Sequence, residues 1–139
     1  MASDQDLFNE LAFYTLSHSS PAFIHQHAVD AFAAQQADEH SKPIATAFAL
    51  IGLYLYIEKG LTGKQVQKAH MQLARQRRQW PQWEPPQERG TLGVSAVLAV
   101  QPGQERDEMI RNWCVAVWDA WKETQIQIRE LVKQELGIG

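Results

Sequence analysis

The sequence predicts an all-α fold: a compact bundle of five or six helices, with a Trp/Pro loop before a long C-terminal helix. Residues 43–57 are apolar almost without interruption, and residues 105–136 repeat apolar side chains at helical spacing. Capping residues also mark the expected boundaries between elements. With 139 residues, 45% of them hydrophobic, the chain suits a single domain over residues 1–139.

The first two expected helices begin at capping signals. Ser3 can cap a helix whose first turn is acidic, where the helix dipole favours negative charge. Ser20 followed by Pro21 predicts the start of the second helix, because proline fits the first helical position. This helix is expected to run to about Gln36.

A third helix is expected over residues 43–57, beginning at Pro43 and ending before Gly60. Its apolar side chains fill nearly the whole circumference, so it must be surrounded by protein. A bilayer crossing needs about 20 residues, more than this segment offers. We therefore predict a central core helix and no membrane contact.

The fourth helix has the clearest start signal. Thr62 and Gln65 have the spacing of a capping box, and Leu61 and Val66 have the spacing of a hydrophobic staple. Because two separate signals coincide, the boundary is well defined. The helix should continue to about residue 80, where a proline ends it.

The segment that follows has a different composition. Three prolines exclude regular structure between residues 81 and 90, and Trp80 and Trp83 are too apolar to stand free in water. We expect an ordered loop. Residues 91–100 suit a short helix or a short strand, and helix is preferred because no strand partner is evident.

The last expected element is one long helix over residues 105–136. Its apolar side chains alternate spacings of four and three, which is the pattern of a helical bundle. The seam consists of Ile110, Cys114, Val117, Trp121, Thr124, Ile128 and Leu131.

A polar cluster on the second helix is the main candidate for chemistry. His27 and Asp30 lie three residues apart and share a helical face, so the carboxylate can orient the imidazole or raise its basicity. His25 lies on the apolar side and is expected to point inward, toward His70. Together with Asp30 or His27, these two imidazoles could hold a divalent metal, Zn²⁺ or Fe²⁺. The alternative is that each is an ordinary hydrogen-bonded histidine, since no spacing here is a metal signature.

The segment HQHAVDAFAAQ, residues 25–35, resembles one shared by an uncharacterised bacterial family of small helical proteins. Members carry H-x-x-x-V-D-A-aromatic-x-x-Q, often followed by histidine and proline, whereas this chain has Gln36. The cysteine-rich segment of some members is also missing here. The similarity continues through residues 60–63 and 69–71 and a Trp-Pro loop, about half the chain. It implies no activity, but it draws attention to His25, Asp30, Gln35 and His70.

Positive charge is concentrated on the fourth helix. No acid occurs between Lys59 and Trp83, although the whole chain carries a net charge of −3. The helix is either a solvated face or a contact surface for an acidic partner, a second copy or phosphates. The acidic balance argues against nucleic acid as that partner. The candidate partner surface comprises Lys64, Lys68, Arg75, Arg77, Arg78, Trp80 and Trp83.

Aromatic residues widen the apolar side of the last helix. Trp121 belongs to its seam, and Trp113 and Trp118 flank it, so the helix either packs on several sides within one chain or forms a homodimer. Cys114 lies on the seam, where a thiol is buried and inert. A single cysteine and the lack of a signal-peptide pattern favour a cytoplasmic location.

These patterns predict a helical binding or interaction module that can form homodimers. No nucleophile elbow, phosphate-binding glycine loop or dinucleotide fingerprint is present. One alternative is a metal-dependent helical-bundle enzyme using His25, Asp30 and His70, and another is a nucleic-acid-associated protein using the basic fourth helix. The fold does not separate them, because helical bundles host all three.

Overall fold

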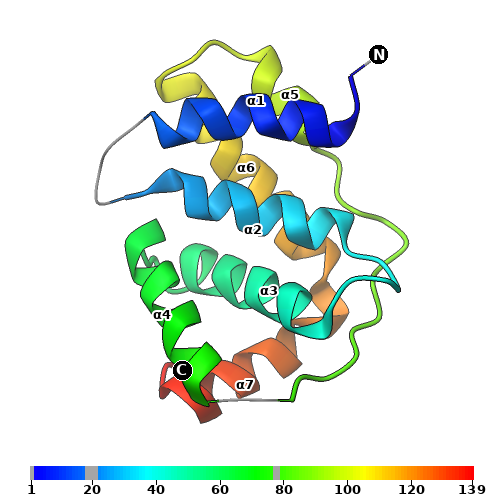
Figure 1. The fold of residues 1–139 in the computed structure, drawn as a ribbon, viewed down its shortest axis with the longest axis vertical. Coiled ribbons are helices and arrows are strands. Elements are labelled where there is room, and N and C mark those ends of the chain that lie inside the picture. Colours follow the sequence, from blue (N-terminus) through cyan, green and yellow to red (C-terminus); the bar gives the residue numbers. More distant parts are fainter. Residues whose placement is uncertain (1, 18–21, 77–78) are drawn as a thin grey trace.

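Regular structure in the described part of the chain is entirely helical. The computed structural model describes residues 2–17, 22–76 and 79–139, and no strand occurs in these ranges. The elements, labelled in Figure 1 where space allows, are α1 (Asp4–Leu16), α2 (Ile24–Gln36), α3 (Pro43–Ile57), α4 (Gly63–Gln76), α5 (Val94–Ala99), α6 (Gln104–Ala120), the short 3₁₀ helix η1 (Lys122–Thr124) and α7 (Gln125–Leu136). The all-α prediction is confirmed, whereas the predicted count of five or six helices is too low for the described residues.

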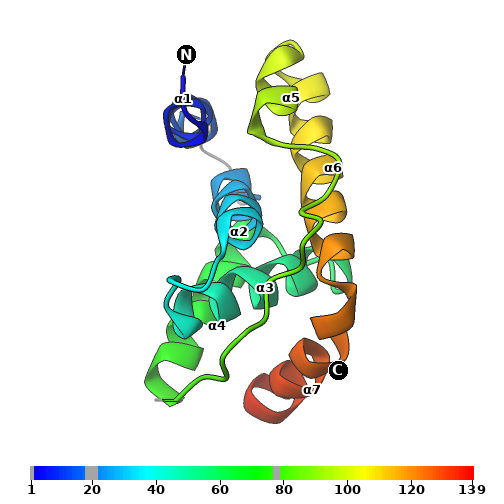
Figure 2. The same cartoon turned by 90° about the vertical axis from the view of Figure 1, so that its right-hand side faces the viewer.

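The apolar helix α3 occupies the centre of the molecule. Nine of its fifteen residues are buried, and α2, α4, α6 and α7 all contact it. Figure 2 shows α6 running alongside the stack of α1, α2 and α3, with α7 turning back beneath α3. Each fully buried Leu or Ile contributes about 1.5–3 kcal/mol, so α3 supplies a large share of the core. No helix within the described residues is long and apolar enough to cross a membrane.

The predicted caps of α1 and α4 are present. The Ser3 hydroxyl accepts from the backbone N–H of Asp6, and the Asp6 carboxylate accepts from the backbone N–H of Ser3. Thr62 and Gln65 form the same reciprocal pair at 2.8 and 3.2 Å. The expected end of the fourth helix near residue 80 is wrong, because residues 79 and 80 are not helical.

The start of α2 is set by a close contact with α4. Ser20 and Pro21, which were expected to start this helix, lie outside the described residues, and α2 begins at Ile24 after a left-handed Phe23 with φ of 43°. The Gly63 N–H donates to the Ala22 carbonyl at 2.6 Å, and a Cβ at position 63 would lie 1.9 Å from the Phe23 carbonyl oxygen. Only glycine permits this approach between the two helix starts.

The long C-terminal helix expected over residues 105–136 is broken at Trp121. Trp121 has φ −93° and ψ 24°, and its indole N–H donates to the Ala34 carbonyl at 3.2 Å. The Gln125 side chain donates to the Trp118 carbonyl at 2.9 Å, which satisfies a group left free by the break. The break lets α7 return across α3, where Arg129 binds Glu58 through two nitrogens, at 3.0 and 2.6 Å.

We predict that Gly52→Ala destabilises the protein by about 2 kcal/mol, despite the ~1 kcal/mol gain in helix propensity. The reason is that a Cβ at position 52 would lie 1.9 Å from Oδ2 of Asp30. Urea denaturation measures the loss. In the Asp30→Ala background the overlap disappears, so Gly52→Ala should cost nothing there. Equal losses in both backgrounds would contradict this account.

Candidate functional site

The polar side chains of α2 are buried against α3 and α6. His27 and Asp30 are each 3% exposed. The His27 ring stacks on Tyr56 of α3, with centroids 3.5 Å apart, and the His27 backbone carbonyl accepts from the Cys114 thiol of α6 at 3.5 Å. The expectation that His27 and Asp30 share a face is therefore met, and that face is internal.

Burial shifts the acid–base properties of this cluster. It raises the pKa of Asp30 well above its usual value, and a hydrogen bond from Gln26 opposes the rise. Burial, together with the nearby Arg111 guanidinium, lowers the pKa of His27 to about 4. Among the residues that the structure describes, neither Oδ2 of Asp30 nor Nδ1 of His27 has a hydrogen-bond partner. His27 is thus neutral at physiological pH, and the cluster is a costly part of the core.

Two members of this cluster have no motif in the sequence. Tyr56 contacts both the His27 ring and the guanidinium of Arg111, which is 5.2 Å from the Tyr56 ring centre. Burial raises the pKa of Tyr56, and a hydrogen bond from Arg111 lowers it in part. The residues come from α2, α3 and α6, so only the tertiary fold brings them together. Their spacing along the chain gives no signal.

The contacts of the candidate metal ligands His25 and His70 are those of ordinary hydrogen-bonded histidines. The residues that the structure describes include no group of three His, Cys, Asp or Glu side chains arranged to hold a metal ion. His25 lies 2.8 Å from the Thr15 hydroxyl of α1, whereas Nε2 of His70 donates to the Phe48 carbonyl of α3 at 2.8 Å. Each imidazole has a partner on a different helix, so His25, Asp30 and His70 do not converge.

Gln35 connects α2 to two distant parts of the chain. Its amide donates to the carbonyls of Arg89 and Leu92 at 3.1 and 2.6 Å, and its carbonyl accepts from the Trp113 indole at 3.0 Å. The Arg89 guanidinium in turn donates to the backbone carbonyls of Gln35 and Ala37. All hydrogen-bonding groups of the Gln35 side chain are therefore engaged in holding the fold.

The predicted partner surface separates into two parts. Lys64, Lys68 and Arg75 are exposed on α4, while Arg77 and Arg78 lie outside the described residues. The aromatic members lie elsewhere. Trp80 packs edge-on against Phe48, with centroids 5.5 Å apart, and the Trp83 indole donates to the Pro43 carbonyl at 3.0 Å.

The tryptophans of the last helices are internal. Trp113, Trp118 and Trp121 are at most 2% exposed in the single chain. The Trp118 indole donates to Glu58 at 2.8 Å, which adds to the partners of Trp113 and Trp121 described above. The tryptophans that widen the apolar side of α6 are therefore buried within one chain.

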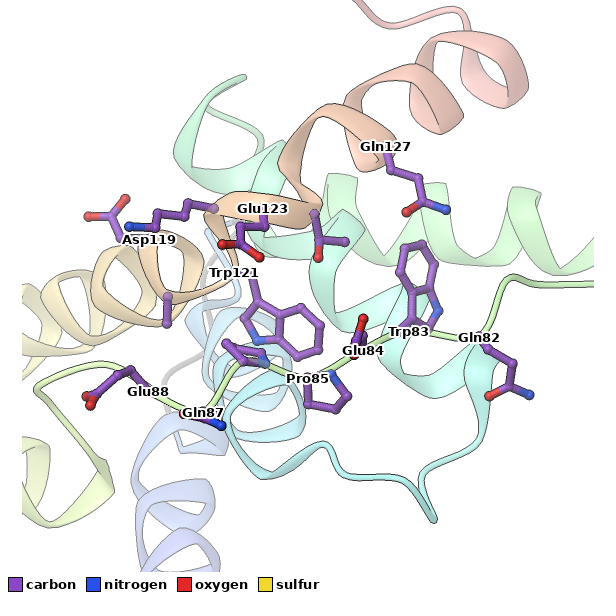
Figure 3. A pocket seen from close by; sticks show the side chains of 14 residues that line it. Gln82, Trp83, Glu84, Pro85, Gln87, Glu88, Asp119, Trp121, Glu123 and Gln127 are labelled. Carbon is purple, nitrogen blue, oxygen red and sulfur yellow. The ribbon is translucent and has the colours of Figure 1, made fainter.

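A groove lies between the Trp-Pro segment, residues 80–88, and the junction of α6 and α7. Its volume is about 780 Å³, and it is lined by residues 82–88 on one wall and by residues 119–124 and Gln127 on the other. In Figure 3, Trp121 and Glu123 from one wall lie next to Trp83 and Glu84 from the other. Sequence reasoning did not find this groove, because the break at Trp121 that forms one wall is invisible in the heptad pattern.

The groove is acidic. Glu84 and Glu88 stand on the Trp-Pro segment, Asp119 and Glu123 stand on the opposite wall, and the one basic residue among the lining side chains is Lys122. Four acids and one base give this lining a charge of −4 + 1 = −3. All five of these side chains are exposed. The four carboxylates are spread over both walls, and none of them forms a salt bridge within the described residues.

Both walls of the groove are anchored to the core. The Trp-Pro segment is held at one end by Trp83 and at the other by Arg89, through the backbone contacts described above. Two consecutive prolines, Pro85 and Pro86, restrict the backbone between these anchors. On the opposite wall Trp121 is fixed to α2 by its indole. The shape of the groove therefore exists before any ligand arrives.

We predict that Asp30→Asn makes the protein more stable at pH 7. The folded state keeps its proton on Asp30 because burial raises the pKa, whereas the unfolded chain ionises near pH 4. The contribution of Asp30 to wild-type stability therefore falls as pH rises above about 4, and asparagine removes this loss. Urea denaturation at several pH values measures the difference, which should vanish below pH 4. A variant that is destabilised at pH 7 but not below pH 4 would show that the ionised carboxylate is needed and would contradict this account.

We also predict a loss of stability as pH falls from 6.5 to 4. Burial lowers the pKa of both His27 and His70 to about 4, while the unfolded state takes up these protons near pH 6.5. The contribution of these two rings to stability is thus complete above pH 6.5, and each ring accounts for a loss of about 3 kcal/mol by pH 4, opposite in sign to the effect of Asp30. His70→Gln should remove about half of the loss seen in urea denaturation. The matched control His40→Gln, at an exposed ring, should leave the pH dependence unchanged.

Comparison with known proteins identifies a family and no activity. The chain matches the family of unknown function DUF5946 over residues 3–122, a range that ends within the break between α6 and α7. No curated protein and no solved structure matches the chain. The resemblance to an uncharacterised family, expected from residues 25–35, is confirmed at that level. The chain belongs to the family of unknown function DUF5946.

Proposed function

We propose that the protein is an interaction module that binds a basic polypeptide segment in the acidic groove. The observation that carries this proposal is the combination of shape and charge: a preformed groove of about 780 Å³ with four carboxylates and one lysine on its walls. A partner with spaced lysine or arginine side chains matches both features. The proposal keeps the prediction of a binding module and assigns it a surface.

The electrostatic contribution of each contact is modest, so several contacts must act together. An exposed ion pair contributes about 0.2–1 kcal/mol, and a cation against an exposed aromatic ring contributes about 0.5–1 kcal/mol. The groove supplies four carboxylates and the partly exposed ring of Trp83. Four ion pairs and one such contact amount to at most about 5 kcal/mol, so an extended basic segment has to meet most of them and is expected to bind weakly.

The anchored walls favour binding because they reduce its entropic cost. A loop that must be ordered by its ligand loses free energy in doing so. Here the hydrogen bonds of Trp83 and Arg89 have already ordered the Trp-Pro segment during folding. The partly exposed Pro85 and Pro86 also present an apolar surface on which the aliphatic stems of lysine or arginine can lie.

We predict that the protein binds a short fluorescein-labelled peptide of alternating arginine and alanine, and that Glu84→Lys/Glu123→Lys weakens binding at least about tenfold. The double reversal changes the lining charge from −3 to +1, which repels the peptide. Fluorescence anisotropy measures both affinities, and binding should weaken as salt is added.

A matched control separates the groove from general surface charge. Glu130→Lys reverses an exposed acid on α7 that does not line the groove, so it should leave peptide affinity within about twofold. A peptide with glutamate in place of arginine should not bind. The proposal fails if wild-type protein does not bind the arginine peptide, or if the Glu130 control loses as much affinity as the groove variant.

A further inference from the structure

The exposed side of α4 carries a basic stripe, which consists of Lys64, Lys68 and Arg75 with Met71 between them. These residues follow one another at spacings of four, three and four, so they form one line along the helix. The line is about 17 Å long at 1.5 Å per residue. All four side chains are exposed, and Met71 is exposed at 54%.

The basic stripe takes little part in the packing of its own chain. α4 contacts α2, α3 and α7, and its buried side chains are Val66, Ala69 and Leu73 on the other side of the helix. Lys64 lies over the Phe23 ring at 4.2 Å. Within the described part of the chain, Lys68 and Arg75 form no salt bridge, and no stripe residue lines the groove.

The basic stripe and the acidic groove are complementary in charge and in pattern. The stripe carries +3 and the groove lining −3. Along the stripe an exposed apolar side chain, Met71, stands between cations. Across the groove an apolar surface made by Trp83 and the prolines stands between carboxylates. The same chain therefore offers both halves of a contact that it does not make internally.

We propose that the groove of one copy binds the basic stripe of α4 from a second copy. This inference rests on the proposed function, because it requires the groove to accept basic side chains, and it names the partner as the chain itself. The two surfaces differ, so the contact is heterologous, and a pair of bound copies still has one free groove on one copy and one free stripe on the other. Such contacts build chains or rings rather than closed twofold dimers.

The test is sedimentation velocity of the full chain over a range of concentrations. Wild type should show an average mass that rises with concentration to about twice the monomer value or more at low salt, and falls toward the monomer at high salt. Lys68→Glu/Arg75→Glu and Glu84→Lys/Glu123→Lys should each remain monomeric. The variant that carries all four substitutions should associate again, because the charges of stripe and groove are once more opposite. Lys133→Glu, at an exposed cation outside the stripe, should associate like wild type.

Peptide binding distinguishes the two proposals. The stripe variant Lys68→Glu/Arg75→Glu has an intact groove, so it should bind the arginine peptide with wild-type affinity or better. If wild type binds the peptide but stays monomeric at every concentration, the inference about the partner is overturned and the proposed function stands. If wild type binds no peptide, both fall. Association that survives both charge reversals, or that the fourfold variant does not restore, also overturns the stripe–groove contact.

Discussion

The structure depends on the need to cover α3 on every side. A helix that is apolar around its whole circumference is unstable in contact with water, and each neighbouring helix of this chain buries a part of it. This requirement explains why α2 and α6 pack along α3, and why α4 lies against it after a short connection at Gly60. It also explains the break at Trp121, because one straight helix over residues 105–136 would extend away from α3 and leave its surface open.

Packing α2 against α3 buries polar side chains of α2, and this burial is energetically unfavourable. Asp30 occupies the space above Gly52, and no other residue at position 52 leaves room for its carboxyl group. The His27 ring stacks on Tyr56, and burial lowers its pKa so that the ring stays neutral. Within the described residues, one polar atom of His27 and one of Asp30 have no hydrogen-bond partner. Burying these two side chains therefore opposes folding. We infer that the buried His27 and Asp30 favour one packing of the core and lower its stability. The stability measurements at low pH and on Asp30→Asn report the size of that loss.

The elements that could be predicted from the sequence are those fixed by local interactions. The capping boxes at Ser3 and Thr62 and the apolar circumference of residues 43–57 are each readable within a few turns, and the structure contains them. The candidate site could not be predicted from the sequence, because a helical wheel gives the side of the helix on which a histidine lies but not the residue that it contacts. His70 donates to a carbonyl one helix away, and the groove exists only because two segments separated by more than thirty residues meet.

The groove and the basic stripe follow from the same constraint that shapes the core. Because α7 turns back to cover α3, the segment between α4 and α5 passes the corner at Trp121. Trp83 anchors that segment to α3, and Trp121 anchors the corner to α2. Acidic side chains on both sides of this corner cannot enter the apolar core, so they collect on the walls of the groove. The cations of α4 are likewise confined to the one side of that helix that faces no neighbour. Burying a single apolar helix thus leaves a groove and a stripe of opposite charge on the surface, and the proposed recognition of a partner depends on that separation.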